Sequence, residues 1–397
     1  MTTPTGSNRP KPLAGVRVLD LTRLLPGPMC TLYLADLGAD VIKIEDTGAG
    51  DYARSFGVAE GEMSPFFSLL NRNKRALRLD LKQAAGRDVF LRLAKDADVV
   101  LESFRPGVMD RLGVGYGTLA AANPRIVYCA ITGFGQDGPY RDRAGHDINY
   151  LAYAGALDQI GAAGGPPAMS NIQIADYLGG SLPAAIGILA ALYDARASGK
   201  GRLVDVAMTD AVAAHMVFPL IAHRLHGHTR PRGEDVITGA MPFHNVYRTA
   251  DGRYMAAGAM EPKFWETMCD ALGRADLKTR QHPATAEERA AVKSEMARVF
   301  ATRTQAEWIA VFADHDCCVT PVLTLEEAMG DPHLAARGMF RDDGRGGVEL
   351  APPYKLSDVE FTAERPAPAP GQHSDEILRE AGFDDAAIAR LRQDKVI

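Results

Sequence analysis

Three polar side chains lie where each of them could carry a proton. His146 stands in the segment Gly145–Tyr150, after a stretch rich in glycine and polar residues. Asp176 precedes a long apolar run, and Glu261 stands just before a proline where a helix is expected to begin. Histidine and the carboxylates are common proton carriers in enzymes, because their pKa values lie near or below neutrality. The three residues are therefore candidates for general acid–base catalysis.

Each of the three residues also has a purely structural interpretation. A polar side chain just ahead of a helix caps its first free N–H groups, which stabilises the helix by about 1 kcal/mol. For His146 the residues alone favour this interpretation, and for Glu261 they make it plausible. Asp176 is different because Gly179 and Gly180 follow it. Glycines allow the close approach of a ligand or of another backbone, and a cap alone does not require them.

A group of three histidines raises the question of a metal site. His223, His226 and His228 are close in sequence, but arginines surround them and Glu234 is the nearest carboxylate. This composition favours a solvated connecting segment over a metal site. The five cysteines are scattered apart from one adjacent pair and show no CxxC spacing, which argues against a zinc or redox motif. We expect no metal.

The elements that position these residues begin with an α/β pattern. Strands are expected at Val16–Leu21 and Asp40–Glu45, with a helix at 29–37 between them, and this implies a right-handed parallel crossover. The acidic end of the second strand is typical of a dinucleotide-binding unit. The turn Leu24–Pro28, however, lacks the GxGxxG glycines that let a pyrophosphate approach the helix. We expect no nicotinamide cofactor.

The rest of the chain extends this sheet and then changes character. Strands are expected at 99–101, 126–131 and 203–207, and a buried helix at 182–193. A segment rich in charge and glycine, 224–239, indicates a linker. The smaller α+β domain after it should contain a hairpin at 246–255 and helices at 262–272, 286–301 and 305–313.

Composition argues against several classes of partner. The 397 residues suggest two to three domains at about 150 residues each. Lys and Arg number 44 against 50 Asp and Glu, a net charge of −6, so the chain lacks the positive excess typical of nucleic-acid or anionic-membrane binding. The most apolar run, Leu182–Tyr193, is shorter than the roughly 20 residues that span a bilayer. Residues 1–9 indicate a leader rather than a signal peptide. The odd number of scattered cysteines fits a reducing compartment, so we expect a cytoplasmic protein.

With these features in place, the sequence resembles a known family. It is similar to the family III CoA-transferases, the CaiB/BaiF superfamily, and within them most similar to the α-methylacyl-CoA racemases. The resemblance covers residues 12–397. It is carried by Pro12–Thr22, Leu34–Glu45, Asn71–Arg75, Phe104–Val108, Ile131–Pro139, Gly199–Arg202, Thr320–Leu323 and Asp331–Leu334.

The resemblance implies a fold that the residues alone do not suggest. Two subunits would interlock like links of a chain, each with a large Rossmann-like α/β domain and a smaller α+β domain. The large domain would comprise 12–223 and part of 332–397, which also contains a return linker, and the small domain would comprise 240–331. The active site would then lie between the large domain of one subunit and the small domain of the other.

The resemblance also implies two competing chemistries, which use Asp176 differently. In a transferase this aspartate would attack the acyl-CoA thioester and become an aspartyl-CoA thioester. In a racemase it would be one of two proton carriers, His146 would be the other, and Glu261 would hold the histidine. Inverting a carbon next to a thioester requires two such groups and donors for the enolate oxygen. We expect backbone N–H groups near Gly179 to be those donors.

Contacts to coenzyme A, which would enter only as part of the substrate, are carried over by position. Two departures from the family pattern concern this region. Ala175 replaces a glycine before the aspartate, and Glu45-Asp46 replaces a basic residue, for which Lys43 is the nearest substitute. Arg105 and Arg111 suit phosphate groups through their forked donors. The implied contacts are Leu79, Asp80, Leu81, Lys82, Ser103, Phe104, Arg105, Arg111, Gly145, Asp147, Asn149 and Tyr150.

The function predicted on these grounds is racemisation of a 2-methylacyl-CoA by two-base proton transfer. The alternative is transfer of CoA to a carboxylic acid through Asp176. His146 favours the first, because the resemblance implies an aromatic residue at this position in most transferases.

Overall fold

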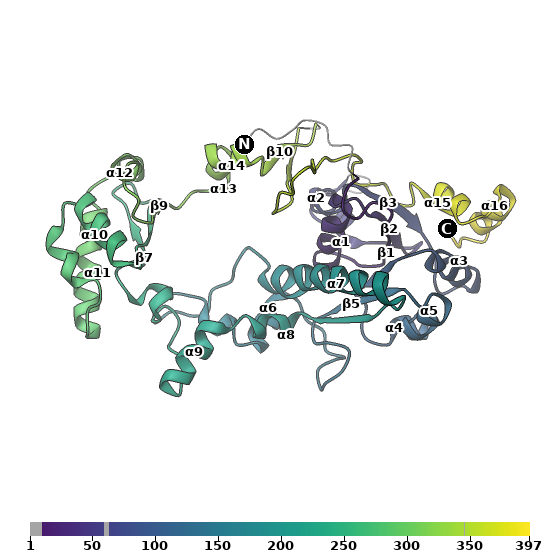
Figure 1. Ribbon diagram of the computed structural model, residues 1–397, viewed down its shortest axis with the longest axis horizontal. Helices are drawn as coiled ribbons and strands as arrows, with labels where there is room; N and C mark the ends of the chain where they lie inside the picture. The colour runs from purple at the N-terminus through teal and green to yellow at the C-terminus, as the bar shows by residue number, and fades with distance from the viewer. Residues whose placement is uncertain (1–9, 59–62, 345) are drawn as a thin grey trace. The chain divides into compact units, whose positions relative to one another are not determined.

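The chain in the computed structural model forms two compact units, each described separately below. The structure describes residues 10–58, 63–344 and 346–397, so the predicted leader, 1–9, lies outside the described residues. The first unit draws on Met1–Gly155, Ser170–His215 and Gly338–Ile397, and the second comprises Ala156–Met169 and Met216–Arg337. Both units therefore combine segments that are far apart in the sequence (Figure 1).

The predicted small domain, 240–331, lies inside the second unit, which is larger than expected. Ala156–Met169 belongs to this unit because Arg232 ties it in, with Nε donating to the carbonyl of Asp158 at 2.7 Å and a terminal nitrogen to that of Gly165 at 2.8 Å. The predicted linker, 224–239, is not a bare connection. It begins within helix α9 (Val217–His226) and ends within a short π-helical turn, η4 (Val236–Ala240).

The first unit is built on a parallel sheet of six strands in the order β3-β2-β1-β4-β5-β6. This confirms the predicted α/β class, and the order places a reversal of winding between β1 and β4. In such sheets ligands bind outside the carboxyl ends of the strands at that point. The strands are β1 (Arg17–Asp20), β2 (Asp40–Glu45), β3 (Lys74–Arg78), β4 (Val99–Glu102), β5 (Val127–Thr132) and β6 (Leu203–Ala207).

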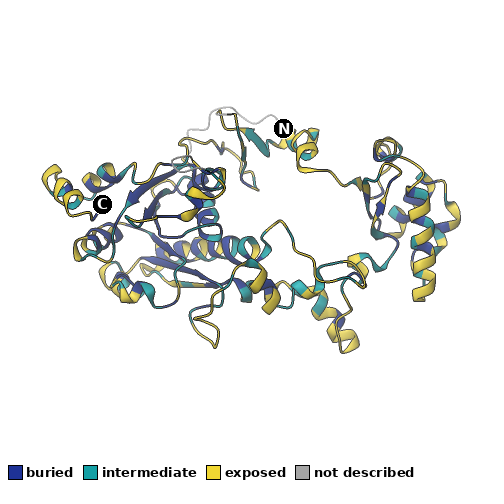
Figure 2. Ribbon diagram, turned by 180° about the vertical axis from the view of Figure 1, so that it is seen from behind, coloured by how far each residue is buried: buried dark blue, intermediate teal, exposed yellow. Residues whose placement is uncertain are grey.

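Helices cover the sheet and bury its apolar side chains. One core joins Leu19, Ile42 and Val100 of the sheet to Phe90 of α3 and Ile377 of α15. Figure 2 shows the central strands of the sheet in the colour of buried residues, and every residue of β4 and β5 is buried. Its helices are α1 (Pro26–Asp36), α2 (Pro65–Asn71), α3 (Ala84–Lys95), α4 (Val108–Arg111), α5 (Tyr116–Ala122), α6 (Asp147–Tyr153), α7 (Leu182–Ser198), α8 (Met208–Ala214), α15 (Ser374–Glu380) and α16 (Asp385–Gln393). A short hairpin pairs β10 (Phe340–Asp342) with β11 (Val348–Leu350).

Helix α7 is longer than the sequence predicted. It continues directly from a π-helical segment, η3 (Ala175–Ser181), so that Ala175–Ser198 forms one apolar helix of 24 residues. By length and composition alone this helix could cross a membrane, so the shortness of the apolar run was a wrong argument. Half of its most apolar window is buried inside the fold, which is also the pattern of a core helix in a globular protein.

The second unit contains a small antiparallel sheet covered by helices. The predicted hairpin is confirmed, with β7 (His244–Arg248) and β8 (Tyr254–Gly258) joined at Gly252 and flanked by β9 (Val319–Pro321). Its core combines aromatic and aliphatic side chains, and the ring of Tyr247 stacks on that of Phe300 with 4.9 Å between the ring centres. The predicted helices are found at α10 (Pro262–Ala271), α11 (Ala286–Phe300) and α12 (Gln305–Phe312), followed by α13 (Leu325–Met329) and α14 (Pro332–Arg337).

Candidate active site

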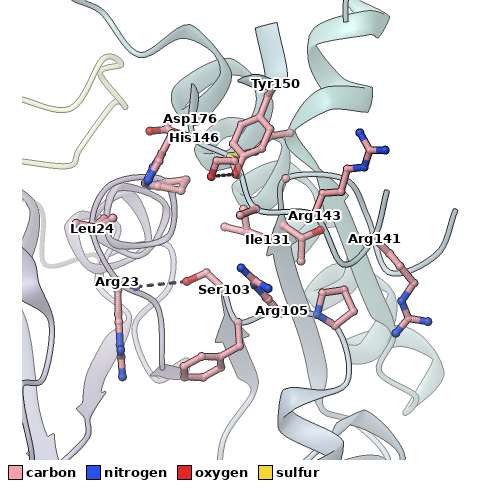
Figure 3. Close-up of a pocket in the computed structure, with 18 of the residues that line it drawn as sticks. Arg23, Leu24, Ser103, Arg105, Ile131, Arg141, Arg143, His146, Tyr150 and Asp176 are labelled. Atoms are coloured by element: carbon pink, nitrogen blue, oxygen red, sulfur yellow. Dashed lines mark hydrogen bonds between the residues drawn. The ribbon is translucent and has the colours of Figure 1, made fainter. Parts of the chain in front are cut away.

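A pocket of about 320 Å³ opens at the carboxyl ends of the central strands. It lies in the first unit, at the reversal of strand order where a doubly wound sheet binds its ligands. Loops after β1, β4 and β5 form its walls, together with the starts of α6, η3 and α8. Figure 3 shows the residues that matter below: Arg23, Leu24, Ser103, Arg105, Arg141, Arg143, His146, Tyr150 and Asp176.

The structure brings His146 and Asp176 into this one pocket. They stand on separate elements, His146 before α6 and Asp176 in η3, and Figure 3 shows them at the same end of the pocket. His146 does occupy the N-cap position of α6, and its backbone N–H donates to Oδ1 of Asn149 at 3.0 Å. Its exposed side chain nevertheless lines the pocket. The capping and catalytic interpretations of His146 are therefore compatible.

Asp147 connects the two elements that carry the candidate proton carriers. Its Oδ1 accepts hydrogen bonds from the backbone N–H of Ala175 at 2.6 Å and of Asp176 at 3.2 Å. These are free donors at the start of η3, which an anionic acceptor satisfies well. Asp147 thus fixes η3 against α6. It does not itself line the pocket.

The environment of Asp176 suits a group that both takes and gives a proton. Burial, and secondly the negative charge of Asp147, raise the pKa of Asp176 to about 7. No ion pair to Asp176 occurs among the described residues that would counter this effect. A carboxyl group with a pKa near neutrality is populated in both protonation states, as a general acid–base catalyst requires.

The glycines after Asp176 serve packing rather than the enolate. A Cβ built on Gly179 would lie 2.6 Å from the carbonyl oxygen of Met208, and one on Gly180 would lie 2.8 Å from Pro26. Both glycines are buried and neither lines the pocket. The structure therefore does not place the predicted enolate donors at Gly179. It shows instead that η3 packs directly against the first turn of α8.

Replacing Gly179 by alanine should test this packing. The added methyl group meets backbone, which cannot move aside cheaply, so we expect a loss of about 1–3 kcal/mol in the free energy of unfolding. Chemical denaturation would measure it. Gly117→Ala is the matched control, because Gly117 lies in α5 with nothing within 4 Å of its Cβ position, and it should not lower stability. Equal stability of the two variants would contradict the assignment.

Four arginines line the pocket, of which the sequence analysis named only Arg105. Arg23 pairs with Asp46 at 2.6 Å and lies over the ring of Phe104 at 5.7 Å. Arg143 lies 4.0 Å from the ring centre of Tyr140, and Arg141 stands on the same exposed loop. Forked guanidinium donors at this density suit a substrate that carries phosphate groups. No signal in a single sequence marks the other three, because the loops that converge here come from different strands.

A second pocket of about 420 Å³ adjoins the first and shares Arg23 and Phe104 with it. All four residues of the predicted contact segment Leu79–Lys82 line this pocket, which also includes Leu21, Ile44, Val108 and Leu112. Its walls are largely apolar, with charged residues among them. The two pockets together follow the carboxyl ends of β1 to β5.

Several predicted site residues lie elsewhere. Arg111, the last residue of α4, and Asn149 line neither pocket. Glu261 belongs to the second unit, where it is exposed at the N-cap of α10 and its side chain makes no capping hydrogen bond. Lys43 cannot replace the missing basic residue after β2, because it is fully buried and pairs with Asp51 at 2.9 Å. Glu45 is likewise occupied, by Arg54.

The loop after β1 reaches the pocket in a conformation that needs support. Leu24, a pocket residue, has a φ of 62°, which costs energy for any side chain other than glycine. Its N–H donates to Asp51 at 3.1 Å, and the buried Lys43 donates to the carbonyl of Thr22 at 2.9 Å. Two buried charged groups therefore hold the loop at Leu24 itself and just before it.

The predicted histidine cluster shows no metal-binding arrangement. His223 and His226 lie on α9 and His228 just beyond it. Across the described residues, no group of three or more His, Cys, Asp or Glu side chains is placed to hold a metal ion.

A parallel-sheet pocket with an acid–base pair and several arginines is typical of an enzyme that acts on a phosphorylated substrate, and comparison with known proteins identifies which kind. The family model "CoA-transferase family III" matches residues 13–374, so the chain belongs to this family. The human protein "Alpha-methylacyl-CoA racemase" is 40% identical over 97% of both chains, and the mouse protein of the same name is 38% identical over 97% of both.

Relatives with a different chemistry are also similar. "Succinyl-CoA--D-citramalate CoA-transferase" of Chloroflexus aurantiacus is 33% identical over 98% of both chains. Among solved structures, a CaiB/BaiF family protein from Brucella suis superposes with a TM-score of 0.83 at 29% identity, covering 94% of this chain and all of the other. The family resemblance read from the sequence is confirmed.

Proposed function

We propose that this protein is a racemase that inverts the α-carbon of a 2-methylacyl-CoA thioester. The observation that carries the proposal is the meeting of His146 and Asp176 in one pocket, with the pKa of Asp176 raised to about 7. The similarity to two proteins named α-methylacyl-CoA racemase supports the choice within the family.

In the proposed reaction one of the two groups removes the α-proton. The electron pair of the broken C–H bond forms the carbon–carbon double bond of the enolate, and the negative charge moves to the thioester oxygen. The other group then returns a proton to the opposite face, so that the reverse configuration forms and no atom is gained or lost. In the reverse direction the roles of His146 and Asp176 exchange. The similar population of both states of Asp176 near neutral pH favours catalysis in both directions.

Coenzyme A would lie across the two adjoining pockets. Arg23, Arg105, Arg141 and Arg143 are proposed to bind its phosphate groups, and Leu79–Lys82 to line the site of its nucleotide. Phe104 stands where both pockets meet. No cofactor beyond the substrate is needed for this chemistry.

Glu261 and the dimer belong to the proposal as well. The family resemblance implies that Glu261 of a second copy completes the site beside His146. Apolar side chains on α7 and α9 support association with a second copy, because Tyr193, Phe218 and Leu225 are 82%, 54% and 71% exposed. All five cysteines are free, which supports a reducing compartment such as the cytoplasm.

The alternative is a CoA-transferase in which Asp176 attacks the thioester. The transferases among the relatives favour it, and Asp176 is positioned in the pocket as a nucleophile would also need to be. The pKa of about 7 does not separate the two functions, because the carboxylate form that a nucleophile needs is the same form that a base needs.

Chiral separation of the acyl-CoA separates the two functions. A single epimer of a 2-methylacyl-CoA incubated with the protein should yield a mixture that approaches equal amounts of both epimers. Addition of succinate should produce no succinyl-CoA. An unchanged epimer together with transfer of CoA to the added acid would make the protein a transferase.

Asp147→Asn should shift the pH dependence of this reaction. The amide keeps an acceptor for the N–H groups of η3 but removes the charge that helps to raise the pKa of Asp176, so that pKa should fall. The corresponding inflection in the pH–rate profile should move to lower pH. Asp194→Asn, which removes a surface carboxylate paired with Arg202, is the control and should leave the profile in place. A shift to higher pH would contradict the electrostatic explanation.

A further inference from the structure

A buried carboxylate lies directly behind the loop that the two pockets share. Glu102, the last residue of β4, is 3% exposed. One carboxylate oxygen, Oε2, accepts a hydrogen bond from the backbone N–H of Phe104 at 2.6 Å, and Oε1 accepts one from the hydroxyl of Tyr128 at 3.4 Å. It forms no ion pair within the described part of the chain. A buried carboxylate without a cation is costly, which points to a functional reason for it.

The charged groups around Glu102 destabilise its ionised form. Tyr128 comes from β5, Asp205 from β6 and Asp110 from α4, and none of these three groups is positively charged. Strand register places Ala130 between Glu102 and Asp205, which aligns the two carboxylates in one row of the sheet. Burial first, and these carboxylates second, raise the pKa of Glu102 to about 7, although the bonds to Phe104 and Tyr128 oppose the change.

The loop that Glu102 holds is shared by both halves of the site. Phe104 lines both pockets, and Ser103 and Arg105 line the first. The hydroxyl oxygen of Ser103 accepts from the N–H of Arg23 at 3.4 Å, and the guanidinium of Arg23 lies over Phe104. The hydrogen bond to the N–H of Phe104 therefore holds the loop that carries Arg105 and that Arg23 contacts through Ser103 and Phe104.

We propose that Glu102 is a positioning residue whose ionised carboxylate holds the 103–106 loop in the conformation that binds coenzyme A. A carboxylate is a stronger acceptor than the protonated acid, so protonation of Glu102 loosens the loop. Binding should accordingly be tighter above a pH of about 7 and weaker below it. The inference deepens the proposed function, because it rests on coenzyme A as the ligand of the two pockets.

Isothermal titration calorimetry with free coenzyme A can test this. Because Asp176 titrates in the same range, both proteins compared carry Asp176→Asn, and one carries Glu102→Gln in addition. Glutamine resembles the protonated acid at every pH. On lowering the pH from about 8 to about 6, the Kd should rise about fivefold more in the protein that keeps Glu102. Ionisation of the phosphate groups of coenzyme A changes the Kd of both proteins by the same factor, so it cancels when their pH dependences are compared.

Two further variants make the result decisive. Tyr128→Phe removes a bond that lowers the pKa of Glu102, so the inflection in Kd should move to higher pH. Glu380→Gln, a change on α15 where the carboxylate pairs with Arg75, should leave the pH dependence unaltered. Equal pH dependence with and without Glu102 would overturn the inference even if coenzyme A binds well. No binding of coenzyme A at any pH would overturn the proposed function together with this inference.

A purely structural role for Glu102 would change stability alone. Its folded-state pKa lies above the ordinary value of 4.5, so its contribution to stability is fully present below that value and is lost as the pH rises through about 7. Glu102→Gln should therefore unfold at higher denaturant concentration than the wild type at a pH of about 8. A stability change without any effect on the Kd would show that the loop does not depend on this carboxylate.

Discussion

Replacing Asp176 by asparagine should lower the rate of epimerisation by about 10³-fold or more while coenzyme A still binds. The amide has nearly the same shape as the carboxyl group, and the hydrogen bonds of Asp176 to Asp147 and Ser181 involve its backbone, which the substitution keeps. It cannot take up or release the α-proton, and a general acid–base group typically contributes 10²–10⁴-fold to a rate. The rate with a single epimer, followed by chiral separation, measures the loss, and calorimetry with coenzyme A measures binding.

The Asp176→Asn variant should also be more stable than the wild type. Misfolding would then not explain its loss of epimerisation activity. The folded-state pKa of Asp176, about 7, exceeds the ordinary value of 3.8. The carboxyl group therefore favours the folded state fully below that lower value and loses this contribution as the pH rises through about 7. At a pH of about 8 the neutral amide removes a buried charge, so the denaturation midpoint should rise. A variant that is well folded and still epimerises at the wild-type rate would exclude Asp176 as a proton carrier.

The second large effect should come from a residue that touches no substrate. Lys74 is fully buried in β3, and its ammonium group donates to the carbonyl of Pro28 and to Asn71 Oδ1, each at 2.9 Å, and lies 3.3 Å from Asp20. Lys74→Met leaves Asp20 in the interior without this cation. Breaking a buried ion pair on one side costs about 3–5 kcal/mol, and we expect a loss of unfolding free energy of that size.

The Lys74→Met substitution should also affect the pocket. Lys74 and Lys43 bind carbonyl groups at the two sides of the loop that contains Leu24, so the loop loses one of these two lysine contacts. Lys278→Met is the matched control, because this lysine pairs with Asp270 near the surface and its loss should change stability by less than about 0.5 kcal/mol. Similar destabilisation by the two substitutions, measured by chemical denaturation, would show that the buried cluster is not a structural anchor.

Local sequence patterns predicted most of the sheet but missed β3. The segment Lys74–Arg78 carries three positive charges, which argues against a buried strand. It is buried because each charge finds a partner from a distant segment, such as Asp20 for Lys74 and Asp40 and Glu380 for Arg75. Periodicity cannot register such compensation, since it depends on contacts between residues that are far apart in the chain.

The candidate site, like the sheet, was predicted only in part from the sequence. His146 and Asp176 were predicted from local sequence and resemblance, and the structure places both in one pocket. Arg23, Arg141 and Arg143 were not predicted, because only the convergence of loops from different strands brings them to Arg105. The enolate donors were expected at Gly179 because a glycine pair can serve either a ligand or a neighbouring backbone, and only the position of Met208 decides between these.

Deuterium incorporation during inversion tests the central claim most directly. A single epimer of a 2-methylacyl-CoA would be incubated with the wild-type protein in D₂O, and the inverted product analysed by mass spectrometry and NMR. Two-base transfer through His146 and Asp176 predicts one solvent deuterium at the α-carbon of each inverted molecule, because the proton returned to the opposite face comes from a group that exchanges with solvent. Inverted product without deuterium at that carbon, or no exchange and no inversion at all, would contradict the account.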